Sequence, residues 1–337
     1  MNFMVDINIP APSKLVGYQQ PLMLVGSCFT EHIGNSLQDM KFEVMQNPNG
    51  ILFDPQSVAA SLVSYTQNKQ YTEKDLFLLN EVWQSWHHHG RFSGMNKTEV
   101  LDMINASQQA AHEFLKKAEW LVITLGSSFS YRLTDLTPEQ QRGNLVPEQS
   151  VANCHRAPSQ WFRKHMMTIE ETKSVLDNAL HQVRYFNKNI KIIYTISPVR
   201  HLRDGVIDNN RSKARLLEVV HHLVNKFDNL FYFPSYELVI DVLRDYRFYD
   251  IDMAHPNYPA TQFVLEKFMS HFVDEPSQQL ANELKKISIA RRHKAFHPGT
   301  EAHQKFLASQ AAKAAELQAQ YPFINLAGEL AYFTGKQ

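Results

Sequence analysis

Four side chains of this 337-residue chain have the types and spacing needed for acyl transfer. Ser27 and Cys28 are adjacent, and each can act as a nucleophile once a base activates it. Asp252 and His255 are three residues apart, so one turn can hold an imidazole base beside the carboxylate that orients it. The pattern predicts a nucleophile early in the chain and its base late.

The two nucleophile candidates lie where an apolar strand, residues 21–25, should be followed by a helix. The next apolar residues recur near helical spacing and give that helix one apolar stripe: Phe29, Ile33, Leu37 and Met40. A strand, a tight glycine turn at Gly26 and a helix N-terminus hold a small side chain at the edge of a sheet. The aligned backbone N–H groups there provide a positive field, which can generate a reactive Ser or Cys.

Strands and helices are expected to alternate along the chain. Apolar runs predict strands at residues 21–25, 41–45, 119–125, 191–196 and 230–233, and helices at 54–65, 99–118, 169–186, 212–227 and 236–243. Continuous apolar strands alternating with helices are typical of a parallel sheet covered on both faces. Ligands bind at the carboxyl ends of such strands. Polar motifs follow four of them, at residues 26–28, 49–50, 126–128 and 197–201.

The run Gly26-Ser27-Cys28-Phe29 looks like the signature of the GSCFA branch of the SGNH or GDSL hydrolase superfamily. The resemblance runs from about Leu22 to about Phe272 and includes residues 153–155, 197–201 and 252–256. It implies a flavodoxin-like three-layer α/β/α sandwich with a parallel sheet. The implied activity is that of an esterase or acyl hydrolase working through an acyl-enzyme, for example on an O-acetyl group. The substrate would be a small-molecule or carbohydrate-type ester.

The choice of nucleophile stays open. An ungapped match to the superfamily pattern Gly-Asp-Ser-Leu-Thr places Cys28 at the nucleophilic serine, whereas a shift of one residue restores Ser27. A serine beside a histidine base and a thiolate at a helix N-terminus are both competent. Alternatively, Cys28 is a small buried hydrophobe and Ser27 is the N-cap of its helix.

His255 is expected to be the general base, and Asp252 to fix its tautomer, with Asp250 as a backup orienter. The alternative interpretation of the pair is an aspartate N-cap and a surface histidine that precedes Pro256.

Donors for an oxyanion hole follow from the resemblance, because the superfamily takes them from the nucleophile turn, a glycine and an asparagine. Gly50 is the matching glycine. Ser128 stands where the pattern Gly-x-Asn-Asp has asparagine, and Asn153 is the candidate to supply the amide from another loop. A lone asparagine in a loop is also a common turn former.

A segment rich in aromatic and histidine residues, 83–92, is expected to border the cleft and select substrate, with Arg91 available for an anion. Adjacent histidines on an extended segment point to opposite faces and lack helical His-x-x-x-His spacing, so no metal site is expected. The substrate-binding candidates in this segment and in the later loops are Trp86, His88, His89, Arg91, His155, Arg200 and His201.

Composition favours one large α/β domain, residues 1–273, followed by a helical extension, residues 274–337. The extension would pack on the domain, form a lid or make a homo-oligomer contact. With 34 basic and 34 acidic residues, the chain is not expected to bind nucleic acid. Two cysteines cannot build a disulfide framework.

The chain opens without a secretory signal pattern and has no apolar run of membrane-spanning length, so the cytoplasm is the expected location and no membrane partner is expected. No metal or organic cofactor is expected.

Two rival functions share these residues. The first is acyl transfer, in which an alcohol rather than water resolves the intermediate. The second is a non-catalytic binding or scaffold protein on a hydrolase fold, which the departure at Ser128 suggests.

Overall fold

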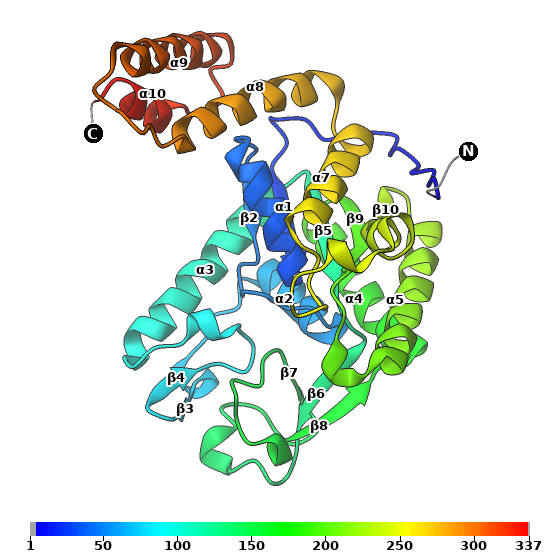
Figure 1. Cartoon of the computed structure of the whole chain (residues 1–337). Coiled ribbons are helices and arrows are strands. Elements are labelled where there is room, and N and C mark those ends of the chain that lie inside the picture. Colours follow the sequence, from blue (N-terminus) through cyan, green and yellow to red (C-terminus); the bar gives the residue numbers. More distant parts are fainter. Residues whose placement is uncertain (1–4, 336–337) are drawn as a thin grey trace.

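A five-stranded parallel sheet forms the centre of the computed structural model, which describes residues 5–335 (Figure 1). Its strands are β1 (Leu22–Gly26), β2 (Val44–Gln46), β5 (Trp120–Leu125), β9 (Lys191–Ile196) and β10 (Leu230–Phe233), in the spatial order β10-β9-β5-β1-β2. The chain order changes direction between β1 and β5. In open α/β sheets the loops at the carboxyl ends of strands beside such a switch form the ligand-binding crevice.

Helices cover both faces of the sheet, because successive strand residues point to opposite sides. Leu22 and Leu24 of β1 join one apolar cluster, whereas Met23 and Val25 join another. The first cluster includes residues of α1 (Cys28–Asp39) and α7 (Tyr258–Phe272), and the second includes residues of α2 (Pro55–Gln67), α3 (Lys97–Lys117), α4 (Ile169–Phe186) and α5 (Val206–Lys226). The mixed α/β architecture expected from the alternating pattern is therefore confirmed.

Local capping explains where the best-predicted helices begin. Before α2, the Asp54 carboxylate accepts the backbone N–H of Ser57 at 3.0 Å, and Pro55 occupies the first helical position. Before α4, Thr168 accepts the N–H of Glu171, whose side chain in turn accepts the N–H of Thr168.

Two antiparallel additions were not predicted from the sequence. One is a hairpin of β3 (Phe77–Leu79) and β4 (Val82–Gln84), and the other is a sheet of β6 (Phe129–Leu133), β7 (Ser150–Val151) and β8 (Phe162–Met166).

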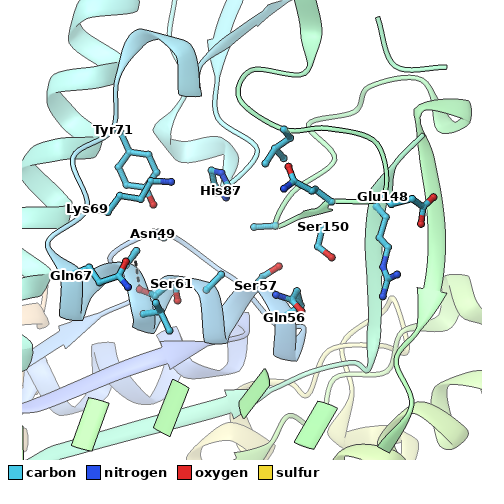
Figure 2. Close-up of a pocket in the computed structure, with 17 residues that line it drawn as sticks. Asn49, Gln56, Ser57, Ser61, Gln67, Lys69, Tyr71, His87, Glu148 and Ser150 are labelled. Carbon is cyan, nitrogen blue, oxygen red and sulfur yellow. Dashed lines mark hydrogen bonds between the residues drawn. The ribbon is translucent and has the colours of Figure 1, made fainter. Parts of the chain in front are cut away.

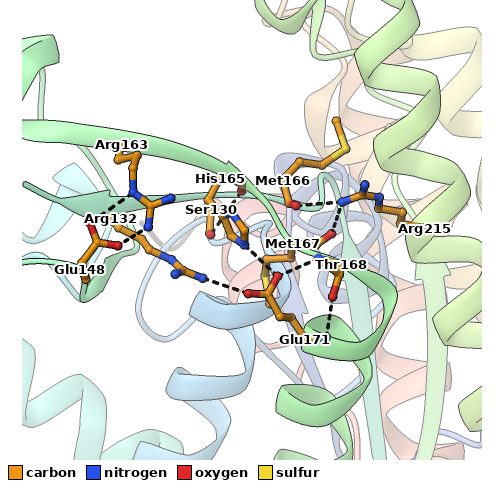
Figure 3. A network of polar contacts seen from close by, with 10 residues as sticks. All are labelled: Ser130, Arg132, Glu148, Arg163, His165, Met166, Met167, Thr168, Glu171 and Arg215. Atoms are coloured by element: carbon orange, nitrogen blue, oxygen red, sulfur yellow. Dashed lines mark hydrogen bonds and ion pairs between the residues drawn. The ribbon is translucent and has the colours of Figure 1, made fainter.

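A polar network attaches the second of these sheets to α4 and α5 (Figure 3). His165 of β8 contacts Glu171 at 2.7 Å. Arg215 of α5 donates to the carbonyl oxygens of Met166 and Met167 at 2.8 and 2.6 Å. The antiparallel sheet is thereby fixed to the helical layer of the main domain.

Two predicted helices differ from the observed ones. α5 begins at Val206, six residues before its predicted start, because Gly205 adopts a positive φ of +80° that turns the chain into the helix. The predicted helix 236–243 is a short α6 (Ser235–Glu237) followed by the π-helical η6 (Leu238–Leu243).

Three further helices follow α7, namely α8 (Glu275–Arg292), α9 (Glu301–Gln320) and α10 (Ala327–Phe333). Leu284, Leu317 and Phe333 belong to the same apolar cluster as α1. Glu329 accepts hydrogen bonds from Lys41 at 2.8 Å and from Arg291 at 3.0 Å. The helices thus pack at the end of α1 opposite Cys28, about 18 Å along a twelve-residue helix, and stand at the top of Figure 1.

None of the helices within residues 5–335 is both long enough and apolar enough to span a bilayer.

Candidate active site

A cavity of about 560 Å³ joins the loops that follow β1, β5 and β9 to the loop that precedes α7. Its wall is formed by Ser27, Cys28, Ile51, Phe53, Ser127, Phe129, Tyr131, Ser197, Val199, Arg200, His201, Leu202, Arg203, Asp204, Asp252, Ala254 and His255. Both nucleophile candidates and the histidine–aspartate pair therefore face one cavity, although they come from opposite ends of the domain.

The nucleophile turn depends on Gly26. Its φ is +146°, and a Cβ atom there would lie 2.2 Å from the carbonyl oxygen of Thr124 on the neighbouring strand β5. Ser27 follows in an extended conformation, with its N–H donating to the same carbonyl at 3.2 Å, and α1 begins at Cys28. The close approach of β1 to β5 thus places Ser27 and Cys28 at the N-terminus of α1.

Ser27 and Cys28 differ in accessibility. Ser27 is 3% exposed, makes no side-chain cap to α1, and its Oγ has no hydrogen-bond partner within residues 5–335. Cys28 is partly exposed. Burial raises the pKa of the Cys28 thiol, whereas the backbone N–H groups of Phe29 and Cys28 and the charge of Lys213 act in the opposite direction.

Asp252 and His255 form a hydrogen-bonded pair. His255 Nδ1 lies 2.6 Å from Asp252 Oδ2, while Asp252 Oδ1 accepts the backbone N–H groups of Ala254 and His255 at 2.9 and 3.0 Å. These bonds, that of the His255 N–H first, lower the pKa of Asp252 to about 2. A carboxylate on Nδ1 leaves Nε2 as the ring atom able to take a proton.

His255, the candidate base, and the two nucleophile candidates line the same cavity. Within the described chain, His255 makes no hydrogen bond to Ser27 Oγ or Cys28 Sγ, and its side chain is 47% exposed. Catalytic hydrogen bonds are often long in enzymes without substrate and tighten in the complex. The loop that carries His255 is attached to the rim of the cavity, since Arg200 N–H donates to the carbonyl of Ala254 at 3.0 Å.

Arg200 and His201 supply polar side chains to the same wall. The Arg200 guanidinium lies over the Tyr249 ring at 4.1 Å. The His201 ring is 5.0 Å from that of Phe53, and burial, reinforced by the charge of Lys213, lowers its pKa to about 3. His201 is therefore a neutral imidazole at physiological pH.

The three oxyanion-hole candidates do not line this cavity. Gly50 N–H donates to the carbonyl of Asn47 at 2.7 Å, and Ser128 N–H donates to Ser212 Oγ at 2.7 Å. Asn153 Oδ1 accepts the N–H of His155 at 2.8 Å, which is the turn-forming role of asparagine. Ile51, Phe53 and Ser127, close neighbours of Gly50 and Ser128 in sequence, line the cavity instead.

Five of the substrate-binding candidates also lie outside its wall: Trp86, His88, His89, Arg91 and His155. Trp86 stacks on Phe77 at 3.8 Å, and His155 Nε2 contacts the carbonyl of Ser85 at 2.8 Å. Burial lowers the pKa of His155 to about 4 and that of His88 well below its ordinary value. Trp86 therefore belongs to an apolar cluster with Phe77 of the β3–β4 hairpin, while Trp83 and Phe92 belong to another. Arg91 pairs with Glu31 at 3.1 Å.

A second cavity of about 530 Å³ lies between α2 and the segment 148–152 (Figure 2). Polar side chains such as Asn49, Ser57, Tyr71 and His87 line it. It contains neither the Ser27–Cys28 turn nor His255, so the cavity at the strand ends is the candidate active site. Residues 5–335 hold no group of three or more His, Cys, Asp or Glu side chains arranged to bind a metal ion.

Sequence reasoning missed Lys213, which is buried beside the carboxyl ends of β5 and β9. Its helical spacing indicates that it is buried, because Lys213 lies on the same helix face as Leu216, Val220 and Leu223, all of them buried. Ser127 and Tyr131 also line the cavity and were missed. The superfamily pattern selects Ser128, the residue after Ser127, and Tyr131 lies on a strand that was not predicted.

Fold and site together define an α/β protein with a Ser-Cys turn and a His–Asp pair facing one cavity at the strand ends. The sequence model of the GSCFA family matches residues 21–268, which include both parts of the site. A model described as the GSCFA domain protein, C-terminal domain, matches residues 284–336. The chain therefore belongs to the GSCFA family. A comparison with curated proteins gave no match.

Proposed function

We propose that this GSCFA protein is an SGNH/GDSL-type esterase or acyl hydrolase that works through an acyl-enzyme. The observation that carries the proposal is the common cavity of the Ser27–Cys28 turn and the Asp252–His255 pair. The strand order supports it, because it is the flavodoxin-like order and the cavity lies beside its switch between β1 and β5.

Cys28 is the favoured nucleophile. It is the more exposed of the two side chains and it begins α1, where the backbone N–H groups of Phe29 and Cys28 oppose the rise in thiol pKa that burial causes. Ser27 is almost completely buried. A cysteine activated by a histidine attacks the ester carbonyl and forms a thioester.

The proton transfers follow from the tautomer of His255. Nε2 takes the thiol proton as Sγ bonds to the carbonyl carbon, and returns that proton to the leaving alcohol when the C–O bond breaks. Water then attacks the thioester, His255 accepts the water proton, and Cys28 recovers it as the acid leaves. Asp252 stabilises the imidazolium in both steps. The positive N-terminus of α1 favours the oxyanion on the carbonyl oxygen.

The wall of the cavity favours a small acyl group on a polar alcohol. Phe53, Phe129 and Val199 offer apolar surface, and Arg200 and Arg203 offer donors for hydroxyl groups. A volume of about 560 Å³ accommodates an acetylated sugar or a molecule of similar size. The preferred substrate class is therefore an O-acetyl ester of a hydroxylated compound, a choice that also rests on superfamily analogy.

Hydrolysis of 4-nitrophenyl acetate by single variants tests the proposal. Cys28→Ala and His255→Ala should lose turnover by at least about a hundredfold, whereas Cys154→Ala, the matched control for the other cysteine, should keep it. Mass spectrometry should detect an acetyl group on Cys28. Unchanged rates in both Ser27→Ala and Cys28→Ala would remove this turn from the mechanism.

The same assay separates the rival functions. Transfer of the acetyl group to an added alcohol, in preference to water, would make the protein an acyltransferase. No turnover across a panel of esters, together with no labelling by fluorophosphonate or thiol-directed probes, would make it a binding or scaffold protein.

A further inference from the structure

Lys213 is a buried lysine next to the nucleophile turn, only 1% exposed. α5 carries it on the face that packs against the sheet. Its Nζ donates to the carbonyl oxygen of Gly126 at 2.5 Å and to that of Ser197 at 2.6 Å. These carbonyls follow β5 and β9, so one amino group joins the two strand ends that open into the cavity.

The two carbonyl acceptors satisfy both N–H groups of a neutral amine, whereas an ammonium group has a third N–H to place. Burial lowers the pKa of Lys213 to about 7. The aromatic ring of Tyr236, 5.8 Å from Nζ, is a further neighbour. The side chain is thus held in one place while its charge changes close to physiological pH.

The turn that carries Cys28 lies beside this amino group. Gly26 pairs with Thr124, and Ser27 N–H donates to the Thr124 carbonyl, two residues before Gly126. The Lys213 charge lowers the pKa of the Cys28 thiol, and the thiolate raises that of Lys213. Other titratable groups also affect pKa values in this cavity. Glu31 on α1 raises the pKa of the Cys28 thiol, whereas His255 and Lys164 on β8 lower the pKa of His201.

We propose that Lys213 is a positioning residue that fixes the ends of β5 and β9 through both carbonyls and, when protonated, stabilises the Cys28 thiolate with its charge. The proposal rests on the proposed function in treating Cys28 as the nucleophile. Its test reads thiol ionisation directly and needs no ester turnover.

The pH dependence distinguishes this role from a merely structural one. Below about pH 7 Lys213 is charged, and Cys28 should then hold about tenfold more thiolate than beside an uncharged residue. Above that pH the charge is lost, and the ratio of thiolate with Lys213 to thiolate with an uncharged residue should fall toward one. A structural defect would instead change reactivity by a factor that does not depend on pH.

The experiment measures the reaction of Cys28 with 4,4′-dithiodipyridine across the pH range in a Cys154→Ser background. Lys213→Met should react about tenfold more slowly than Lys213 at low pH and at the same rate at high pH. The matched control is Cys154 in a Cys28→Ser background. Burial and Asp54, not Lys213, raise the pKa of Cys154, so Lys213→Met should leave its profile unchanged.

A second measurement covers the case in which Lys213→Met does not fold. With Lys213 in place, the logarithm of the Cys28 rate should rise with pH, flatten for about one pH unit near neutrality, and rise again, because two coupled groups titrate. Cys154 should show a single ionisation. A single-step Cys28 profile, or a rate ratio between Lys213 and Lys213→Met that is constant with pH, would overturn the proposal whether or not the protein hydrolyses esters.

Discussion

Asp252 holds His255 twice, once at the ring and once at the backbone. One carboxylate oxygen lies 2.6 Å from the imidazole Nδ1, and the other accepts the N–H of the same histidine at 3.0 Å. The aspartate therefore fixes both the position of the turn and the tautomer of the ring. This relationship makes Asp252 the orienter of the proposed base.

Asp252→Asn should lower kcat for ester hydrolysis by between about a hundredfold and ten-thousandfold, because an amide favours the wrong tautomer. Asp250→Asn, two residues away, is the matched control and should stay near wild type, because Asp250 contributes its backbone N–H to the turn. Equal losses in the two variants would show that charge in the loop matters, and orientation does not.

Asp54 predicts a pH-dependent stability. It is 5% exposed, and burial raises its pKa to about 6, above the ordinary 3.8. The folded protein therefore binds this proton more tightly than the unfolded chain, and the free energy of unfolding should fall as pH rises from about 4 to about 6. Asparagine still caps α2 but carries no charge.

Asp54→Asn should consequently stabilise the protein by about 1–3 kcal/mol at neutral pH and by much less at about pH 4.5. Urea unfolding at the two pH values measures the difference. The same gain at both would mean that the carboxylate is not penalised by burial.

Gly26→Ala should disrupt the nucleophile turn, because the new Cβ would meet the Thr124 carbonyl oxygen at 2.2 Å and φ is +146°. We expect a loss of at least about 3 kcal/mol in unfolding free energy. Gly205→Ala is the control, since its φ is also positive but nothing lies within 4 Å of the added atom. That variant should lose only about 1 kcal/mol in the same denaturant titration.

The sequence predicted the sheet, because continuous apolar strands and strong caps are local signals. Of the four motifs expected at strand ends, 26–28, 126–128 and 197–201 contribute to the cavity wall, whereas 49–50 does not. The helix at residues 169–186 agrees with α4 because Thr168 and Glu171 form a capping box. Short antiparallel strands such as 77–79 carry too few residues to show a period, so the hairpin and the β6–β8 sheet were missed.

Side-chain surroundings were harder to predict than element positions. Trp86 and His155 looked suited to a substrate cleft but pack together under the hairpin, a long-range contact that no local pattern encodes. Gly50 and Ser128 are sequence neighbours of the cavity residues Ile51 and Ser127, yet their N–H groups are already engaged by Asn47 and Ser212. Spacing along the chain predicts which residues lie near one another. Which backbone N–H groups are already hydrogen-bonded depends on the completed fold.

Glu329 predicts a change in stability without a change in activity. Burial raises the pKa of its carboxyl, but hydrogen bonds and charges, those of Lys41 first and Arg291 among them, outweigh burial and hold that pKa below its ordinary value. Its stabilisation is therefore present above about pH 4.5 and is lost as pH falls through the lower folded-state value.

Glu329→Gln should cost about 1–3 kcal/mol at neutral pH, because it leaves two cations with a weaker partner. Ester turnover should be unchanged, since α10 packs at the opposite end of α1 from Cys28. Lys305→Ala removes a fully surface pair with Glu301 and should change stability by less than about 0.5 kcal/mol. Thermal unfolding and the ester assay, run on the same preparations, check both statements.

The hydrogen bond from the N–H of Arg200 to the carbonyl of Ala254 joins the loop after β9 to the loop that carries His255. A bulky leaving group that displaced the loop after β9 would therefore also displace the His255 imidazole. If the proposed esterase activity holds, an oversized ester should therefore be turned over slowly even when it enters the cavity, because accommodating it would move His255 out of alignment.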